Sequence, residues 1–182
     1  GGSVAVYNNE NVRVAELTRV QRMSPTLGRK PPEGAIVLFD GTTADEFDGG
    51  KLSEDKLLMQ GCTSRKKLGS GELHVEFMLP YMPNARGQGR GNSGVYLQGR
   101  YEVQVEDSYG KEPYSIYLGG IYGFIDPLFQ AAKPSGEWQT YDITLVGRKV
   151  SVTLNGQKVI VEQNIPGITG GAMDSDEAAP GP

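Results

Sequence analysis

The chain has 182 residues, of which 37% are hydrophobic, and its formal net charge at pH 7 is -4. This length and apolar content predict one domain with a sizeable core, flanked by tails. The acidic balance, without a basic stripe, argues against a nucleic-acid partner. No apolar run reaches the roughly 18 to 20 residues of a transmembrane segment, and the single cysteine, Cys62, excludes an internal disulfide.

Residues 1–34 are predicted to form an irregular N-terminal arm or linker, because Ser24-Pro25 and Pro31-Pro32 interrupt any regular element. A β-sandwich domain is expected over residues 35–168. Residues 169–182 are expected to be a flexible C-terminal segment that stops before a final strand.

Short apolar or alternating runs between glycine-rich turns predict an all-β antiparallel sandwich. In the clearest strand, over residues 72–79, apolar side chains alternate with Glu72, His74 and Glu76. Asn155-Gly156 predicts a type I′ turn, since both residues accept positive φ angles. The pattern includes no long amphipathic helix. The other predicted strands cover residues 12–17, 35–39, 57–60, 95–98, 101–106, 120–123, 141–146, 150–154 and 158–162.

A second polar strand face follows a glycine-rich loop at residues 80–91. After this loop, two valines alternate with Glu102, Gln104 and Glu106, so one face packs and the other presents carboxylates and an amide. The polar face is either ordinary solvated surface or the floor of a groove for a polar ligand. Three arginines either bind hydroxyls or carboxylates through their forked donors or keep the segment soluble: Arg86, Arg90 and Arg100.

Glu72 and Glu76 cannot act together, because four residues of extended strand separate them by about 13 Å. A cooperating pair needs one residue from positions 72, 74 and 76 and one from 102, 104 and 106, on adjacent strands with Cβ atoms about 5 Å apart. His74, the only histidine, either shuttles protons beside its flanking carboxylates or is an ordinary exposed side chain. Trp138 either stacks on a sugar ring or packs in the core.

Five segments carry a family resemblance: Leu38-Phe39-Asp40-Gly41-Thr42, Glu72-Leu73-His74-Val75-Glu76-Phe77, the run from Gly91 to Gln104, Gly119-Gly120-Ile121-Tyr122-Gly123, and Trp138-Gln139-Thr140-Tyr141-Asp142. Over roughly residues 31 to 182, the chain resembles the 3-keto-disaccharide hydrolase domain family. The resemblance implies a concanavalin A-like lectin/glucanase sandwich of the jelly-roll type, exported from bacterial cells and acting on glycosides oxidised at the sugar C3. The chain departs from the family pattern at Leu118, where members commonly carry a cysteine, and it lacks their terminal strand with Gln-Asp-His-Gly-Asn-Pro.

The resemblance also implies a chemistry. A ketone at C3 acidifies the proton on C2, so a positioned base can remove that proton and expel the group at C1. Mapped onto matching positions, the catalytic base is Glu102, Glu76 or His74. The donors that hold the enolate oxygen are Arg100, Asn92 or Gln104. The predicted substrate-binding residues together are Asn92, Gln104, Arg100, Arg90, Tyr96 and Trp138.

Three functional hypotheses stay open. The first is an extracytoplasmic (periplasmic or secreted) carbohydrate-active domain, with its groove over residues 72–76 and 101–106. The second is a non-catalytic accessory or scaffold subunit that docks onto a larger extracytoplasmic or membrane-associated complex through residues 1–34 or an open sheet edge. The third is a lectin-like module that binds glycans without turnover. No cofactor and no metal in the site are expected; a structural calcium site stays open, without a loop spacing that supports it.

Overall fold

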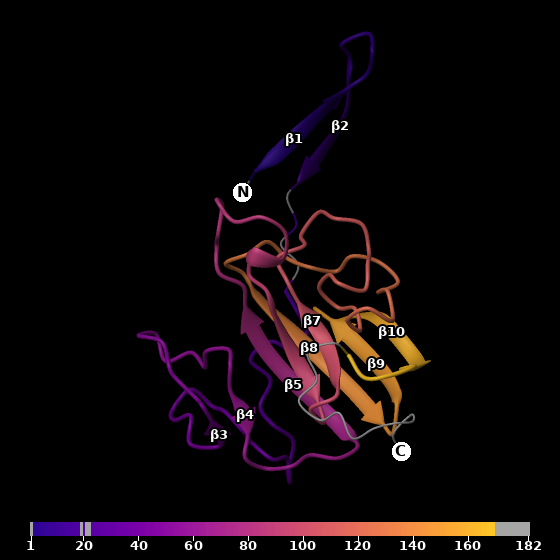
Figure 1. Ribbon diagram of the computed structural model, residues 1–182. Helices are drawn as coiled ribbons and strands as arrows, with labels where there is room; N and C mark the ends of the chain where they lie inside the picture. Colours follow the sequence, from indigo (N-terminus) through magenta and orange to yellow (C-terminus); the bar gives the residue numbers. More distant parts are fainter. Residues whose placement is uncertain (1, 19, 21–22, 170–182) are drawn as a thin grey trace.

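A computed structural model describes residues 2–18, 20 and 23–169 of the protein. Within these ranges the regular secondary structure is almost wholly β, its strands pair antiparallel, and one 3₁₀ turn, η1 (Gly87–Gly89), is present (Figure 1). The described strands are β1 (Ser3–Tyr7), β2 (Arg13–Thr18), β3 (Phe47–Asp48), β4 (Thr63–Ser64), β5 (Gly71–Met78), β6 (Ser93–Leu97), β7 (Tyr101–Val105), β8 (Trp138–Val146), β9 (Lys149–Leu154) and β10 (Gln157–Asn164).

A four-stranded antiparallel sheet, in the order β10-β9-β8-β5, forms one layer of the sandwich (Figure 1). The predicted turn between β9 and β10 is confirmed, because Asn155 and Gly156 have the positive φ angles, 52° and 81°, that a type I′ turn requires. The alternation predicted for β5 is also confirmed, since Leu73, Val75 and Phe77 pack against the core.

The second layer consists of β6, β7 and a short bridging segment. β6 pairs antiparallel with β7, and Val103 of β7 forms an isolated bridge with Ile121. Val103 and Tyr141 of β8 are fully buried in the core between the layers. The Tyr141 hydroxyl donates a 2.6 Å hydrogen bond to the Gln104 carbonyl, and its ring centroid lies 4.9 Å from that of Phe77. These contacts hold the core face of β8 against the backbone of β7.

The polar sides of β5 and β7 therefore point in opposite directions. Side chains alternate along a strand, and the apolar residues of both strands face the shared core. His74 and Glu76 consequently point outward from one layer, and Glu102 and Gln104 point outward from the other. β5 pairs with β8 and not with β7. A residue at position 72, 74 or 76 therefore cannot act together with one at position 102, 104 or 106.

The polar side of β7 is covered by the protein itself. Glu102 is 9% exposed, Gln104 1% and Glu106 0%. The segment that follows β7 crosses this side, where the Ile116 carbonyl accepts a 3.2 Å hydrogen bond from the Gln104 amide. The face predicted as solvated surface or open groove floor is thus largely buried.

Three of the predicted strands are wrong or reduced. Residues 35–39 form no strand. Residues 57–60 contribute a single bridge, through Leu58, and residues 120–123 contribute bridges through Ile121 alone. A short apolar run becomes a strand only where a neighbour pairs along its length, and these runs have no such neighbour among the described residues.

The N-terminal arm is more regular than predicted. The strand expected at residues 12–17 is present as β2, and an unpredicted strand, β1, pairs with it in an antiparallel hairpin. Figure 1 shows this hairpin extending away from the sandwich. Of the predicted C-terminal segment, only Thr169 falls inside the described ranges; residues 170–182 lie outside them.

Candidate functional site

Tyr96 and Glu102 form the best-defined pair of candidate site residues. They are direct cross-strand partners on β6 and β7, and the Tyr96 hydroxyl donates a 2.8 Å hydrogen bond to Glu102 Oε2. Thr169 lies beside them, because its Oγ1 accepts a 3.2 Å hydrogen bond from the Glu102 amide. The sequence indicated both members of the pair. It gave no signal for Thr169, which follows Glu102 by 67 residues.

Burial sets the acid–base character of this pair. It raises the pKa of the Glu102 carboxyl above its ordinary value, and the hydrogen bond from Tyr96 opposes that rise. Burial, together with the hydrogen bond and negative charge of Glu102, raises the pKa of Tyr96 to about 12. Tyr96 therefore remains a neutral donor at neutral pH. Glu102, once ionised, is a stronger base than an exposed glutamate.

Gly94 makes room for the Glu102 carboxylate. A Cβ at position 94 would lie 2.1 Å from Glu102 Oε1 and 2.6 Å from its Cγ. Gly94 is paired with Gln104 in the strand register, so the Glu102 side chain leans diagonally across the ladder to cover it. Gly94 belongs to the Asn-Ser-Gly segment of the family resemblance, yet no sequence pattern shows that its missing side chain serves Glu102.

A second polar cluster surrounds Glu106, just beyond β7. This buried carboxylate accepts a 3.2 Å hydrogen bond from the Gln88 amide and lies 3.8 Å from Lys111 Nζ. Burial raises the pKa of Glu106, and Lys111 and Gln88 oppose the rise. Asn92 donates a 2.9 Å hydrogen bond to Gln88 Oε1 and so belongs to this cluster. Glu102 and Glu106 are about 13 Å apart along the extended chain, too far to act on one bond.

The other predicted ligands on this side are mostly engaged within the protein. Arg90 forms a 2.7 Å ion pair with a buried aspartate, and Arg86 donates to carbonyls of its own loop. The Gln104 amide is held by the segment that covers β7. Arg100 is closer to the Tyr96–Glu102 pair, since its carbonyl accepts a 2.9 Å hydrogen bond from the Thr169 amide.

His74 and Glu76 lie on the outer face of the four-stranded sheet, on the other side of the molecule. His74 Nδ1 is 2.7 Å from Asp142 Oδ1, and His74 Nε2 is 3.4 Å from Glu76 Oε1. Trp138 is 39% exposed on this outer face, so it neither packs in the core nor approaches Glu102. The structure therefore divides the predicted catalytic residues into two separate groups.

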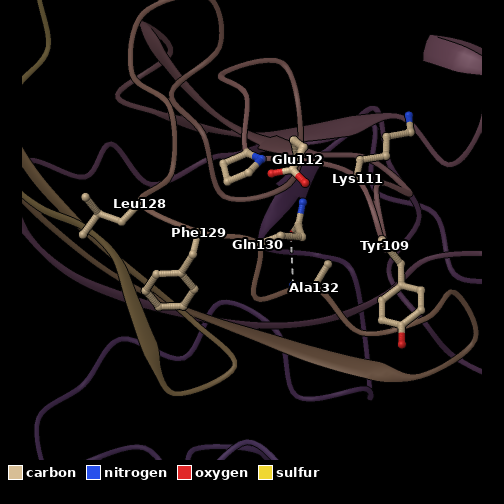
Figure 2. Close-up of a pocket in the computed structure, with 9 residues that line it drawn as sticks. Tyr109, Lys111, Glu112, Leu128, Phe129, Gln130 and Ala132 are labelled. Atoms are coloured by element: carbon tan, nitrogen blue, oxygen red, sulfur yellow. Dashed lines mark hydrogen bonds between the residues drawn. The ribbon is translucent and has the colours of Figure 1, made fainter. Parts of the chain in front are cut away.

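An open hollow of about 510 Å³ lies between residues 109–113 and residues 128–132. Figure 2 shows Tyr109, Lys111, Phe129 and Gln130 among the side chains that line it. Lys111 also contacts Glu106, so the hollow adjoins the second polar cluster. It is built from loops without a periodic pattern, so the sequence carries no signal for it.

Two further properties concern the described part of the chain. There, no group of three or more His, Cys, Asp or Glu side chains is placed to hold a metal ion. No helix in those ranges combines the length and apolar character needed to cross a membrane.

Solved structures that match the chain come from Parabacteroides distasonis ATCC 8503. The crystal structure of a predicted glycosyl hydrolase matches with a TM-score of 0.69 and 28% identity, covering 90% of this chain and 81% of that one. This match confirms the predicted jelly-roll type of β-sandwich. Two other predicted glycosyl hydrolases match with TM-scores of 0.42 and 0.41 and identities of 23% and 16%; they cover 53% and 68% of this chain, and 52% and 70% of their own. No curated protein matches.

The family comparison covers most of the chain. Residues 34–182 match the 3-keto-alpha-glucoside-1,2-lyase-like domain. The matched part contains the Tyr96–Glu102 pair, the Glu106 cluster and the four-stranded sheet, whereas the β1–β2 hairpin precedes it. The chain therefore belongs to the family of 3-keto-alpha-glucoside-1,2-lyase-like domains, a carbohydrate-active family similar to glycosyl hydrolases, in agreement with the resemblance seen in the sequence.

Proposed function

We propose that this protein cleaves glycosides whose sugar carries a ketone at C3, by eliminating the group bound at C1. The observation that carries the proposal is the partly buried Tyr96–Glu102 hydrogen bond, which provides one base of raised pKa beside one neutral donor. The family to which the chain belongs is named for a 1,2-elimination at such a sugar.

Glu102 is the proposed base. Its carboxylate takes the proton from C2, whose acidity comes from the adjacent C3 ketone, and the negative charge passes to the ketone oxygen as an enolate. The enolate then expels the C1 oxygen substituent, so that a C1–C2 double bond forms and the C3 ketone returns. The proton removed from C2 is balanced by the proton that the leaving oxygen acquires.

Tyr96 and Arg100 have supporting roles in this scheme. The Tyr96 hydroxyl, neutral at neutral pH, orients the Glu102 carboxylate through the 2.8 Å hydrogen bond. Arg100 is the proposed donor to the enolate oxygen, because a preorganised cation stabilises charge that develops during reaction. His74 and Glu76 have no part in the scheme, since both point outward from the opposite layer.

The deciding experiment supplies the full chain with a 3-keto-α-glucoside and, separately, with the same glycoside unoxidised. We expect release of the leaving group from the keto sugar only. Glu102→Gln should lower the rate at least 100-fold, whereas the matched surface variant Glu72→Gln should keep it. Binding of the keto sugar without release would instead support the lectin-like hypothesis, and equal rates in Glu102→Gln would remove Glu102 from the mechanism.

An extracytoplasmic location is part of the same proposal. It is supported by the family resemblance, because members of that family are usually exported from bacterial cells. Fractionation of source cells, with the chain followed by antibody, tests it; recovery with cytoplasmic markers alone would contradict it.

Docking onto a larger assembly is a second candidate function, favoured by the β1–β2 hairpin. Val4, Val14 and Leu17 of this hairpin are 65%, 58% and 59% exposed, and a lone two-stranded hairpin is only marginally stable in water. A protein partner that covers these side chains would stabilise it. Native mass spectrometry of material purified from its source should then show a complex that the double variant Val4→Ser, Leu17→Ser loses.

A further inference from the structure

Residues 24–29, here called the strap, lie across the outer face of the four-stranded sheet. Ser24 Oγ is 2.5 Å from Thr140 Oγ1, and Thr26 Oγ1 donates a 2.8 Å hydrogen bond to Asp142 Oδ2. The Gly28 amide donates to Glu76 Oε1. Three strap residues at alternate positions thus bind three side chains of β5 and β8. The strap backbone is folded into turns, because the Leu27 amide donates to the Ser24 carbonyl and the Arg29 amide to the Thr26 carbonyl.

His74 joins the two carboxylates that hold the strap. Its two ring nitrogens lie 2.7 Å from Asp142 Oδ1 and 3.4 Å from Glu76 Oε1. Asp142 also lies 3.8 Å from the guanidinium of Arg29. The only histidine and its acidic neighbours are therefore engaged with the strap and with each other.

The strap is held mainly by these polar contacts. Ser24 is its one buried residue, Leu27 is partly buried, and Pro25, Gly28 and Arg29 are exposed. Segments with few buried apolar contacts open at low free-energy cost, well below that of global unfolding. The strap is thus held by specific contacts and can still leave the sheet.

We propose that the outer face of the four-stranded sheet is a docking surface for a hydroxyl-bearing turn, that the strap is its resident occupant, and that His74, Glu76 and Asp142 form the latch. This assigns to His74 and Glu76 a binding role in place of the catalytic one expected from sequence. The latch anchors the arm that carries the β1–β2 hairpin, and its release uncovers Thr140 and Asp142. The proposal is independent of turnover at Glu102.

Hydrogen exchange of the full chain, followed by mass spectrometry, tests the latch. Thr26→Val removes the donor from the strap, and Asp142→Ala removes the acceptor from the sheet. Each should speed exchange of the peptide spanning residues 23–30 at least tenfold. Glu72→Ala, on the same face of β5, is the matched control and should change it by less than twofold.

A double variant separates a shared contact from two unrelated effects. If Thr26 and Asp142 act through one hydrogen bond, the acceleration in Thr26→Val, Asp142→Ala should fall well below the product of the single effects. Faster exchange of the β9 peptide in Asp142→Ala would show that this variant disturbs the sheet itself. The test of the latch would then rest on Thr26→Val alone. Strap exchange within twofold of the parent protein in Thr26→Val would overturn the proposal.

Discussion

Gly94 and Glu102 are mutually fitted: the glycine leaves open the space in which the carboxylate lies, and a Cβ at position 94 would come within 2.1 Å of Glu102 Oε1. The nearest atoms belong to the end of a flexible side chain and not to the backbone. The protein can therefore relieve such a clash by moving Glu102, at the expense of its hydrogen bond to Tyr96.

Gly94→Ala should consequently damage function more than stability. We expect a loss of about 1 kcal/mol in the free energy of unfolding, near the lower end of overpacking effects, with about 100-fold loss in kcat for the keto sugar, as expected for a displaced catalytic group. Urea denaturation and single-turnover kinetics measure the two quantities. Gly71→Ala, a strand glycine with open space around its Cβ position, is the control. Unchanged kcat in Gly94→Ala would contradict the assigned fit.

Tyr96→Phe should raise the pKa of Glu102 further, because the hydrogen bond from Tyr96 is what lowers it. A base must be ionised to act, so the acid limb of the kcat/KM profile should move to higher pH. The pH profile, or carbon NMR of the labelled Glu102 carboxyl, measures the shift. Tyr81→Phe, at a 73% exposed position, should leave the profile in place. A shift toward lower pH would show that the hydrogen bond does not act on Glu102 as described.

Burial of Glu102 and Glu106 should make stability depend on pH. Since the folded pKa of each lies above the unfolded value, each contributes stability that is full below the unfolded pKa and is lost as pH rises through the folded pKa. Glu102→Gln removes one of these contributions. The free energy of unfolding of the Glu102→Gln variant, measured in urea at pH 5 and at pH 8, should fall less between these two pH values than that of the parent protein. Equal falls would argue against burial of the charge.

Tyr141→Phe should weaken the contact between the two layers. The buried Tyr141 hydroxyl donates to the Gln104 carbonyl and accepts a 2.7 Å hydrogen bond from the Gly119 amide. Its removal leaves buried polar groups with fewer partners, which costs about 1 to 3 kcal/mol in the free energy of unfolding. Equilibrium urea unfolding provides the measurement, with the 58% exposed Tyr109→Phe as control. Equal stability of the two variants would mean that this hydroxyl does not join the layers.

Gly156→Ala should disturb the seat of Pro25, because a Cβ there would lie 2.4 Å from Pro25 Cδ. Gly136 has a similar φ of 84°, against 81° for Gly156, but open space at its Cβ position. Both alanine variants carry the strain of a positive φ, so their difference isolates the contact with Pro25. We expect Gly156→Ala to be the less stable of the two by thermal unfolding. Equal midpoints would show that Pro25 moves aside freely.

Local patterns predicted the parts of the fold that are themselves local. The β9–β10 hairpin follows from Asn155-Gly156, whose φ angles need no distant contact, and the two faces of β5 follow from alternation alone. The strand predicted at residues 35–39 is absent because a strand needs a partner to pair with, and composition does not show which segments pair. β1 was missed for the same reason, since its stability comes from pairing with β2.

The site was predictable only in its chemistry. Alternation showed that Glu102 and His74 lie on polar strand faces. Their positions relative to each other depend on which strands pair, and this is not visible in the sequence. β5 pairs with β8, which brings His74 next to Asp142, 68 residues later in the chain. Thr169 and Gly94 enter the site through packing and not through a repeated pattern. The polar residues under the strap likewise looked catalytic, because the sequence does not show what covers them.

The opposed orientation of β5 and β7 has a practical outcome for handling the molecule. Because stacked sheets lie about 10 Å apart, the hydrophobic core separates the strap from Tyr96 and Glu102. Immobilising the protein on a resin or electrode through its amino-terminal arm should therefore leave the β6–β7 layer, which carries Tyr96 and Glu102, on the side that faces the solution.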